Sequence, residues 1–234
     1  MRFQDAARDG RAIVYAGIQA DPLVKRAATL LADATPAQRI LARAVMNGET
    51  TDVAGWLAMF PTLFGASVPS GPERTRSEAI LSASLEVAGR GEQVRSQFRG
   101  AIVEELTATL LARRVGVAGV HRERRILFDG VRAEIHPYDV TVEREGAAEA
   151  YDCKWGARGI NDDVLHQLDD ARGHAAEEDE PLQVALVIFD AERSCEVRLE
   201  RQYAPRAGTT IVPLESLDRL AAGAPGTPGP PAGQ

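Results

Sequence analysis

The spacing of apolar residues divides the chain into two regions. Up to about residue 98, Leu, Val, Ile and Ala recur at helical intervals, and two segments open with an N-cap residue followed by proline, at Asp21-Pro22 and Thr35-Pro36. Beyond a helical segment that ends near Val115, apolar residues alternate or run continuously, as they do in strands. The pattern predicts an N-terminal helical region over 1–98 and a mixed β-sheet core flanked by helices over 99–220.

The predicted core contains a helix, three successive strands, a second helix and a buried strand. The strands are expected at 121–128, 131–143 and the segment ending at Lys154, and Pro137 indicates that the second is an edge strand or carries a bulge. Asn161 caps the second helix, and the continuous apolar run 181–190 is typical of a strand buried on both faces.

The C-terminal part of the chain is less regular in pattern. Charged and apolar residues alternate over 194–203, which predicts a further strand, and 213–220 should form a short helix. The glycine- and proline-rich residues 221–234 are expected to be disordered.

The stretch from Tyr138 to Lys154 contains the candidate catalytic residues. If Glu145 and Gly146 form a two-residue hairpin turn, opposing residues have numbers that sum to 291, and Asp139 faces Asp152. Side chains alternate across a strand, so Asp139, Asp152 and Lys154 should share a polar face. The partner face should pack against the rest of the core through apolar residues: Tyr138, Val140, Val142, Tyr151 and Cys153.

Two carboxylates placed opposite each other call for a compensating charge. Directly opposed like charges destabilise a hairpin by up to about 1 kcal/mol, and such a pair raises the pKa of one carboxyl group. A divalent cation between Asp139 and Asp152, with Lys154 beside it, would relieve this repulsion and could activate water against a phosphodiester. The alternative is an amphipathic hairpin whose solvated face holds simple salt bridges.

Asp139 followed by Asp152-Cys153-Lys154 at the end of an apolar strand resembles the PD-(D/E)xK nuclease superfamily, and the surrounding order of elements from about 99 to 190 is similar to it. Tyr138 separates Pro137 from Asp139, so the first pair of the motif is not literal. The resemblance implies a restriction-endonuclease-like α+β core and metal-dependent hydrolysis of DNA, in preference to RNA. A RecB-like branch is suggested by Gln167, which would orient the lysine or a water molecule.

The resemblance also implies a set of site residues and a cofactor. One or two Mg²⁺ or Mn²⁺ ions would be held by carboxylates and a backbone carbonyl, and Lys154 would orient or deprotonate the attacking water. A first-helix glutamate would complete the site, with Glu104 favoured by its G-x-x-x-E spacing and Glu105 as the fallback; both could equally be solvated helix residues. The expected metal ligands are Asp139, Asp152, the Cys153 carbonyl and Glu104.

Composition and charge indicate the cellular compartment and the class of partner to expect. Two cysteines and the lack of a signal sequence favour a reducing cytoplasm, and no apolar run is long enough for a membrane span. The net charge is −7, yet residues 90–125 carry eight arginines and four acids, a basic segment that could flank the site. We expect DNA as a partner and a homodimer through the helical region. The alternative is a catalytically inactive nuclease-like fold that binds nucleic acid or protein as an adaptor.

Overall fold

The protein is described by a computed structural model that covers residues 1–6, 10–48, 50–129, 131–132, 136–202 and 210–223. The chain forms two compact units, a helical unit over Asp9–Leu106 and a sheet unit made of Met1–Arg8 and Thr107–Gln234. The long helix α7, Glu92–Val115, contributes its first part to the helical unit and its last part to the sheet unit. None of the helices in the described residues combines the length and the apolar composition that a membrane span requires.

The helical unit confirms the helical prediction for most of residues 10–98. Proline begins several of its helices, as the sequence predicted at Pro22 and Pro36. Besides the start of α7, the described helices are α1 (Gly10–Gln19), α2 (Pro22–Ala32), α3 (Pro36–Asn47), α4 (Val53–Met59), α5 (Pro61–Phe64) and α6 (Pro72–Ala88).

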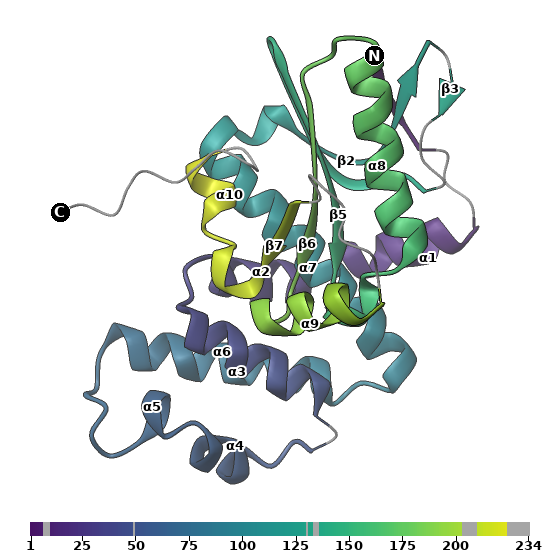
Figure 1. The fold of residues 1–234 in the computed structure, drawn as a ribbon. Helices are drawn as coiled ribbons and strands as arrows, with labels where there is room; N and C mark the ends of the chain where they lie inside the picture. Colours follow the sequence, from purple (N-terminus) through teal and green to yellow (C-terminus); the bar gives the residue numbers. More distant parts are fainter. Residues whose placement is uncertain (7–9, 49, 130, 133–135, 203–209, 224–234) are drawn as a thin grey trace, which may run out of the picture. The chain divides into compact units, whose positions relative to one another are not determined.

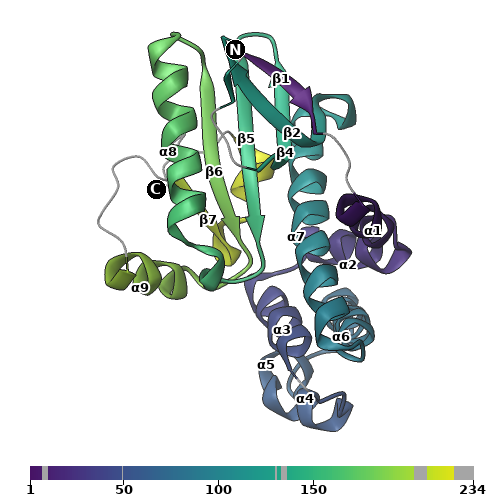
Figure 2. The ribbon, with the colours of Figure 1, turned by 90° about the vertical axis from the view of Figure 1, so that its right-hand side faces the viewer.

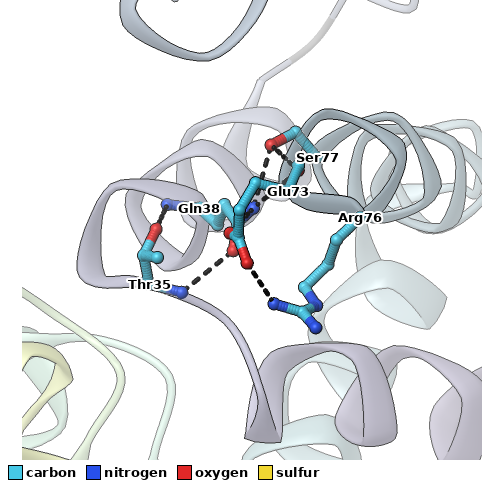
Figure 3. A network of polar contacts seen from close by, with 5 residues as sticks. All are labelled: Thr35, Gln38, Glu73, Arg76 and Ser77. Atoms are coloured by element: carbon cyan, nitrogen blue, oxygen red, sulfur yellow. Dashed lines mark hydrogen bonds and ion pairs between the residues drawn. The ribbon is translucent and has the colours of Figure 1, made fainter. Parts of the chain in front are cut away.

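A polar network joins α3 to α6 inside this unit (Figure 3). Thr35 and Gln38 form a capping box, in which the Gln38 backbone donates to the Thr35 hydroxyl and the Gln38 side chain accepts from the Thr35 backbone at 2.9 Å. The amide nitrogen of Gln38 then donates to Ser77 Oγ at 2.9 Å and to the Glu73 carbonyl oxygen at 3.1 Å. Because Gln38 is only 1% exposed, these bonds satisfy a polar group that would otherwise be costly to bury.

The sheet unit is built on one mixed sheet. Within the described residues it has seven strands, in the order β1-β2-β4-β5-β6-β7 with β3 paired to β2. The first four strands of this order are antiparallel neighbours, while β5, β6 and β7 run parallel. The strands are β1 (Arg2–Asp5), β2 (Val120–Phe128), β3 (Val131–Arg132), β4 (Tyr138–Arg144), β5 (Ala147–Lys154), β6 (Leu182–Ile188) and β7 (Thr210–Pro213).

Helices cover both faces of this sheet. The crossover helix α8, Asp162–Glu177, lies along β6 (Figures 1 and 2) and buries Leu165, Leu168 and Ala171 against Ala150 and Leu186. On the opposite face, the last part of α7 meets β5, where Cys153 Sγ lies 3.5 Å from Thr107 Oγ1. The sheet unit is therefore a mixed α/β layered fold, and the helix, meander, helix, strand order expected from the sequence is present as α7, β2-β4-β5, α8 and β6.

Several predicted elements were wrong. The segment expected to be a strand over 194–203 is helix α9, Glu192–Gln202, because Cys195 and Leu199, four residues apart, pack together against the core. The chain also starts with strand β1 rather than a helix. Strand β7 precedes the segment 213–220 that was expected to be a short helix, and that segment forms a 3-10 turn, Leu214–Ser216, and the start of the short helix α10, Arg219–Ala222. Residues 224–234 of the predicted tail lie outside the described residues.

The edge position suggested by Pro137 is also wrong. β4 lies between β2 and β5, and Pro137 comes just before its first residue, where its missing N–H breaks no ladder. Irregularity occurs instead on the neighbouring strand β2. In the β2–β4 register, Glu123 stands opposite Asp139 and has φ 51, in the left-handed region that non-glycine residues seldom adopt.

Candidate functional site

The hairpin of β4 and β5 has the register that its turn predicted. Val140 pairs with Tyr151 and Thr141 with Ala150, so the paired numbers sum to 291. Gly146 has φ 70, which glycine adopts without steric cost in the two-residue turn. One further step along this register places Asp139 opposite Asp152.

Asp139, Asp152 and Lys154 converge at the C-terminal end of β5. The Lys154 ammonium lies 2.5 Å from Asp152 Oδ1, and Asp139 Oδ2 accepts a hydrogen bond from the Cys153 backbone N–H at 2.6 Å. The Cys153 side chain points to Thr107 on the other face, as alternation along the strand requires. The three charged groups predicted from the sequence thus lie together, while the thiol does not take part.

Neighbouring carboxylates stabilise the protonated form of Lys154. Burial by itself would lower the pKa of the ammonium group, but the charges of Asp152 and Asp139, together with the hydrogen bond to Asp152, raise the pKa above its usual value. Lys154 therefore stays protonated at neutral pH. Such a group donates hydrogen bonds and neutralises negative charge, and it is a poor base.

The face that carries these residues is not the solvated face of a simple amphipathic hairpin. Asp152 is 6% exposed and Thr141 is fully buried, and the parallel register sets Asp152 beside Leu186, a residue of the core under α8. Tyr138, expected on the opposite face, belongs to this same core, and its hydroxyl donates to the Gln167 carbonyl oxygen at 3.3 Å. The buried position of Asp152 weakens screening by water and strengthens its attraction for cations, while Asp139 is partly exposed.

Gln167 holds the chain that leads into β4. Its side-chain oxygen accepts from the His136 backbone N–H at 3.3 Å, and its amide nitrogen donates to the His136 carbonyl oxygen at 3.1 Å. Gln167 is 5% exposed, so this pair of bonds fixes the backbone three residues before Asp139. The Gln167 side chain is thus bonded to the His136 backbone, and these bonds do not involve the His136 side chain, which is exposed.

Glu104 is described within the helical unit. Its carboxylate accepts hydrogen bonds from the Tyr15 hydroxyl at 2.6 Å and from the Gln19 amide at 2.8 Å, and it is 6% exposed. It is therefore not a solvated helix glutamate, whereas Glu105 is half-buried. In its own unit Glu104 joins α1 to α7, and its role as a metal ligand stays a prediction.

The donor set suits a hard cation only in part. Asp139 and Asp152 offer carboxylate oxygens, which Mg²⁺ and Mn²⁺ prefer, but no cluster of three or more His, Cys, Asp or Glu side chains suited to a metal occurs in the described residues. Mg²⁺ commonly binds through one or two carboxylates and keeps several waters. Two carboxylates and a backbone carbonyl therefore fit a Mg²⁺-like ion that completes its shell with water and substrate.

Two residues that the sequence analysis did not single out support the loop after Lys154. Asp190, 5% exposed at the end of β6, accepts backbone N–H bonds from Ala157 at 3.0 Å and from Ala191 at 2.8 Å. Gly159 packs directly on the Lys154 stem, since a Cβ at this position would lie 2.6 Å from Lys154 Cβ. A polar residue that directly ends a buried strand is a signal that could have identified Asp190; no signal in the sequence marks Gly159.

The basic segment over 90–125 is largely occupied by internal ion pairs. Arg114 forms an ion pair with Glu149, with Nη1 3.0 Å from Oε1, and Arg124 forms one with Asp5 at 2.8 Å. Arg99 in the helical unit lies 2.8 Å from Glu92, which also pairs with Arg95. These four arginines therefore stabilise the two units and do not form an open basic surface.

Comparison with known proteins adds little to this geometry. No protein-family model matches the chain, and no curated protein matches it. Among solved structures, the chain is similar to the crystal structure of protein VC1899 from Vibrio cholerae, with 16% sequence identity and a TM-score of 0.45. The match covers 94% of this chain and 57% of that one, so the chain spans little more than half the length of VC1899.

Proposed function

We propose that this protein is a metal-dependent nuclease that hydrolyses phosphodiester bonds, in DNA in preference to RNA, on a restriction-endonuclease-like core. The observation that carries the proposal is the convergence of Asp139, Asp152 and Lys154 at the end of β5, with Lys154 Nζ 2.5 Å from Asp152. The sequential order of α7, the β2-β4-β5 meander, α8 and β6 supports it.

The chain's own groups have distinct roles in this proposal. A bound Mg²⁺ or Mn²⁺ would polarise the scissile phosphate and lower the pKa of a coordinated water. Asp139 and Asp152 would hold the ion with the Cys153 carbonyl. Lys154, kept protonated by the two carboxylates, would orient the water and offset charge on the phosphate oxygens.

The test is cleavage of single-stranded and duplex DNA, and of RNA, with and without Mg²⁺. Asp152→Asn and Lys154→Met should each lower the rate by about a hundredfold or more, because the first weakens binding of the cation and the second removes a positive charge beside the reacting phosphate. Glu145→Gln, an exposed acid in the turn of the same hairpin, is the matched control and should cleave normally. Retained Mg²⁺-dependent cleavage in either site variant would refute the assignment.

A nuclease-like fold that binds without cleaving is the second candidate. It is favoured by one observation, that both carboxylates already have protein partners, Lys154 for Asp152 and the Cys153 backbone for Asp139. Under this function the wild-type protein binds nucleic acid or a protein but shows no Mg²⁺-dependent cleavage, and its affinity is the same in the Asp152→Asn variant.

A homodimer through the helical unit is part of the first proposal. The helix α4 exposes Val53, Leu57 and Met59, which are 47%, 37% and 58% exposed. Apolar side chains gathered on one short helix would be covered by a second copy. Light scattering on the wild type and on a Leu57→Lys, Met59→Lys variant tests this, and an unchanged mass would contradict it.

A further inference from the structure

A groove lined by arginines lies between α9 and the loop that follows Lys154. We name it the arginine groove; its volume is about 420 Å³, and the residues that define its character are Arg158, Arg193, Ser194, Val197, Arg198 and Arg201. Among the described residues that line it, four are arginines and none is acidic. A concave surface with charge of one sign concentrates ligands of the opposite sign.

The charge of the groove arises from the way α9 sorts its side chains. The helix carries three arginines and three glutamates, so it has no net charge. Its groove side holds Arg193, Val197 and Arg201, which follow one another at intervals of four residues, about one helical turn apart. The glutamates Glu192, Glu196 and Glu200 do not line the groove. Glu196 does pair with Arg193, at 3.1 Å between Oε2 and Nη1, but both side chains are exposed, and such a surface pair is weak and leaves the guanidinium accessible. The arginine stripe is therefore a property of the folded helix.

Another groove of the sheet unit provides a contrast. It measures about 560 Å³ and is lined by Arg2 and Arg144 but also by Glu143 and Glu180. Its mixed charges favour no anion in particular. The absence of carboxylates from the described lining of the arginine groove is thus a local feature and does not follow from an excess of arginine, since the whole chain has a net charge of −7.

The arginine groove is built on the loop that supports the candidate site. Gly159 contacts the Lys154 stem, and Arg198 donates from Nε to the Ile160 carbonyl oxygen at 3.2 Å, which ties α9 to this loop. Since four residues of chain span at most about 14 Å, Arg158 Cα lies within that distance of Lys154 Cα. A strand in duplex geometry advances about 3.4 Å per nucleotide, so at most about four nucleotides bridge the two positions.

We infer that the arginine groove binds the phosphodiester backbone of a nucleic-acid strand and leads it to the Lys154 end of β5. The inference rests on the proposed function for the chemistry of its ligand. Arginine suits the task because its planar group donates two parallel hydrogen bonds to one phosphate. Arg158, Arg193 and Arg201 are exposed, and Ser194 adds a hydroxyl donor.

The test measures binding of a fluorescein-labelled single-stranded DNA by anisotropy, in EDTA and over a range of KCl concentrations. An Arg193→Gln, Arg201→Gln variant should bind about tenfold or more weakly, and the slope of log K against log salt should fall by about 1.4, or 0.7 for each lost phosphate contact. Glutamine favours helix nearly as well as arginine, so α9 should persist. The single variants Arg158→Gln and Arg201→Gln should show smaller changes in the same direction.

The matched control is Arg26→Gln, Arg219→Gln, which removes the same charge from exposed positions outside the groove. The inference is overturned if wild type does not bind, if the groove variant binds as wild type does, or if the control loses as much affinity. It is also overturned if polyglutamate competes as well as unlabelled DNA, which would indicate an acidic protein as the partner.

This experiment fails separately from the proposed function, because it is done without metal. Normal DNA binding by the groove variant, combined with cleavage that depends on Asp152, would refute the groove and leave the nuclease. Groove-dependent binding by a wild-type protein that never cleaves DNA would refute the nuclease and leave the groove.

Discussion

Replacement of Gly159 by alanine should displace the lysine of the candidate site. The new Cβ would lie 2.6 Å from Lys154 Cβ, 2.7 Å from Cγ and 3.1 Å from Cδ. Carbon atoms pack at about 3.5–4.0 Å, so the closest pair falls short by about 0.9–1.4 Å. The contacted atoms belong to the start of the side chain, next to the backbone of β5, and cannot simply swing away.

The magnitude follows from overpacking and from misplacement. Forcing a methyl group into a filled site costs about 1–3 kcal/mol of the free energy of unfolding. If Lys154 acts in catalysis, a shift of about 1 Å should also slow cleavage by about a hundredfold. Gly159 does not have a left-handed φ, so the substitution is expected to act through this contact rather than through backbone strain.

Urea unfolding of four proteins isolates the contact. Gly159→Ala is compared with wild type. The double variant Gly159→Ala, Lys154→Gly is compared with Lys154→Gly, which lacks the side-chain atoms that the new methyl would meet. The penalty should fall to below about 0.5 kcal/mol in that background. Gly173→Ala, at an exposed α8 position with no atom within 4 Å, is the control and should stabilise by up to about 1 kcal/mol. Equal penalties in both backgrounds would show that Gly159 does not press on Lys154.

Three further predictions concern the sheet unit. Glu149, 1% exposed, pairs with Arg114, whose side chain is 9% exposed. Glu149→Gln should therefore lower the free energy of unfolding in urea by about 3–5 kcal/mol, while Glu145→Gln should leave it almost unchanged. A loss under about 1 kcal/mol for Glu149→Gln would contradict the buried pair. Asp190→Ala removes the acceptor of two backbone N–H groups and should cost about 2 kcal/mol or more, with Asp190→Asn losing less; equal losses would argue against the backbone bonds. The pKa of Lys154 is raised above its ordinary 10.5, so its ion pair stabilises the fold fully below pH 10.5 and less as the pH rises further. The difference in unfolding free energy between wild type and Lys154→Met should therefore narrow above pH 10.5. A difference that widens there would be inconsistent with the raised pKa.

The hairpin could be predicted because its signals are local. A two-residue turn fixes the register, and the register fixes which side chains oppose one another, so Glu145-Gly146 was enough to bring Asp139 toward Asp152. The buried strand β6 and the N-caps of α2 and α3 were likewise read from adjacent residues.

The remaining features depend on packing between distant segments. In α9, apolar and charged residues alternate as in a strand, and only the core contact of Cys195 and Leu199 makes the helix favourable. β1 has a single apolar residue that packs on the core, Phe3, too little for a periodic signal. The contact of Gly159 with Lys154 arises from a loop path that no spacing encodes. The position of Asp190 at the end of a buried strand is visible in the sequence, but its bond to Ala157 depends on the same loop path.

The measurement that tests the central claim most directly is a calorimetric titration of the protein with Mn²⁺. Wild type should bind the ion, Asp139→Asn and Asp152→Asn should each bind at least about tenfold more weakly, and Glu145→Gln should match wild type. If wild type shows no specific binding, or if both aspartate variants bind as tightly as wild type, the two carboxylates do not form a metal site.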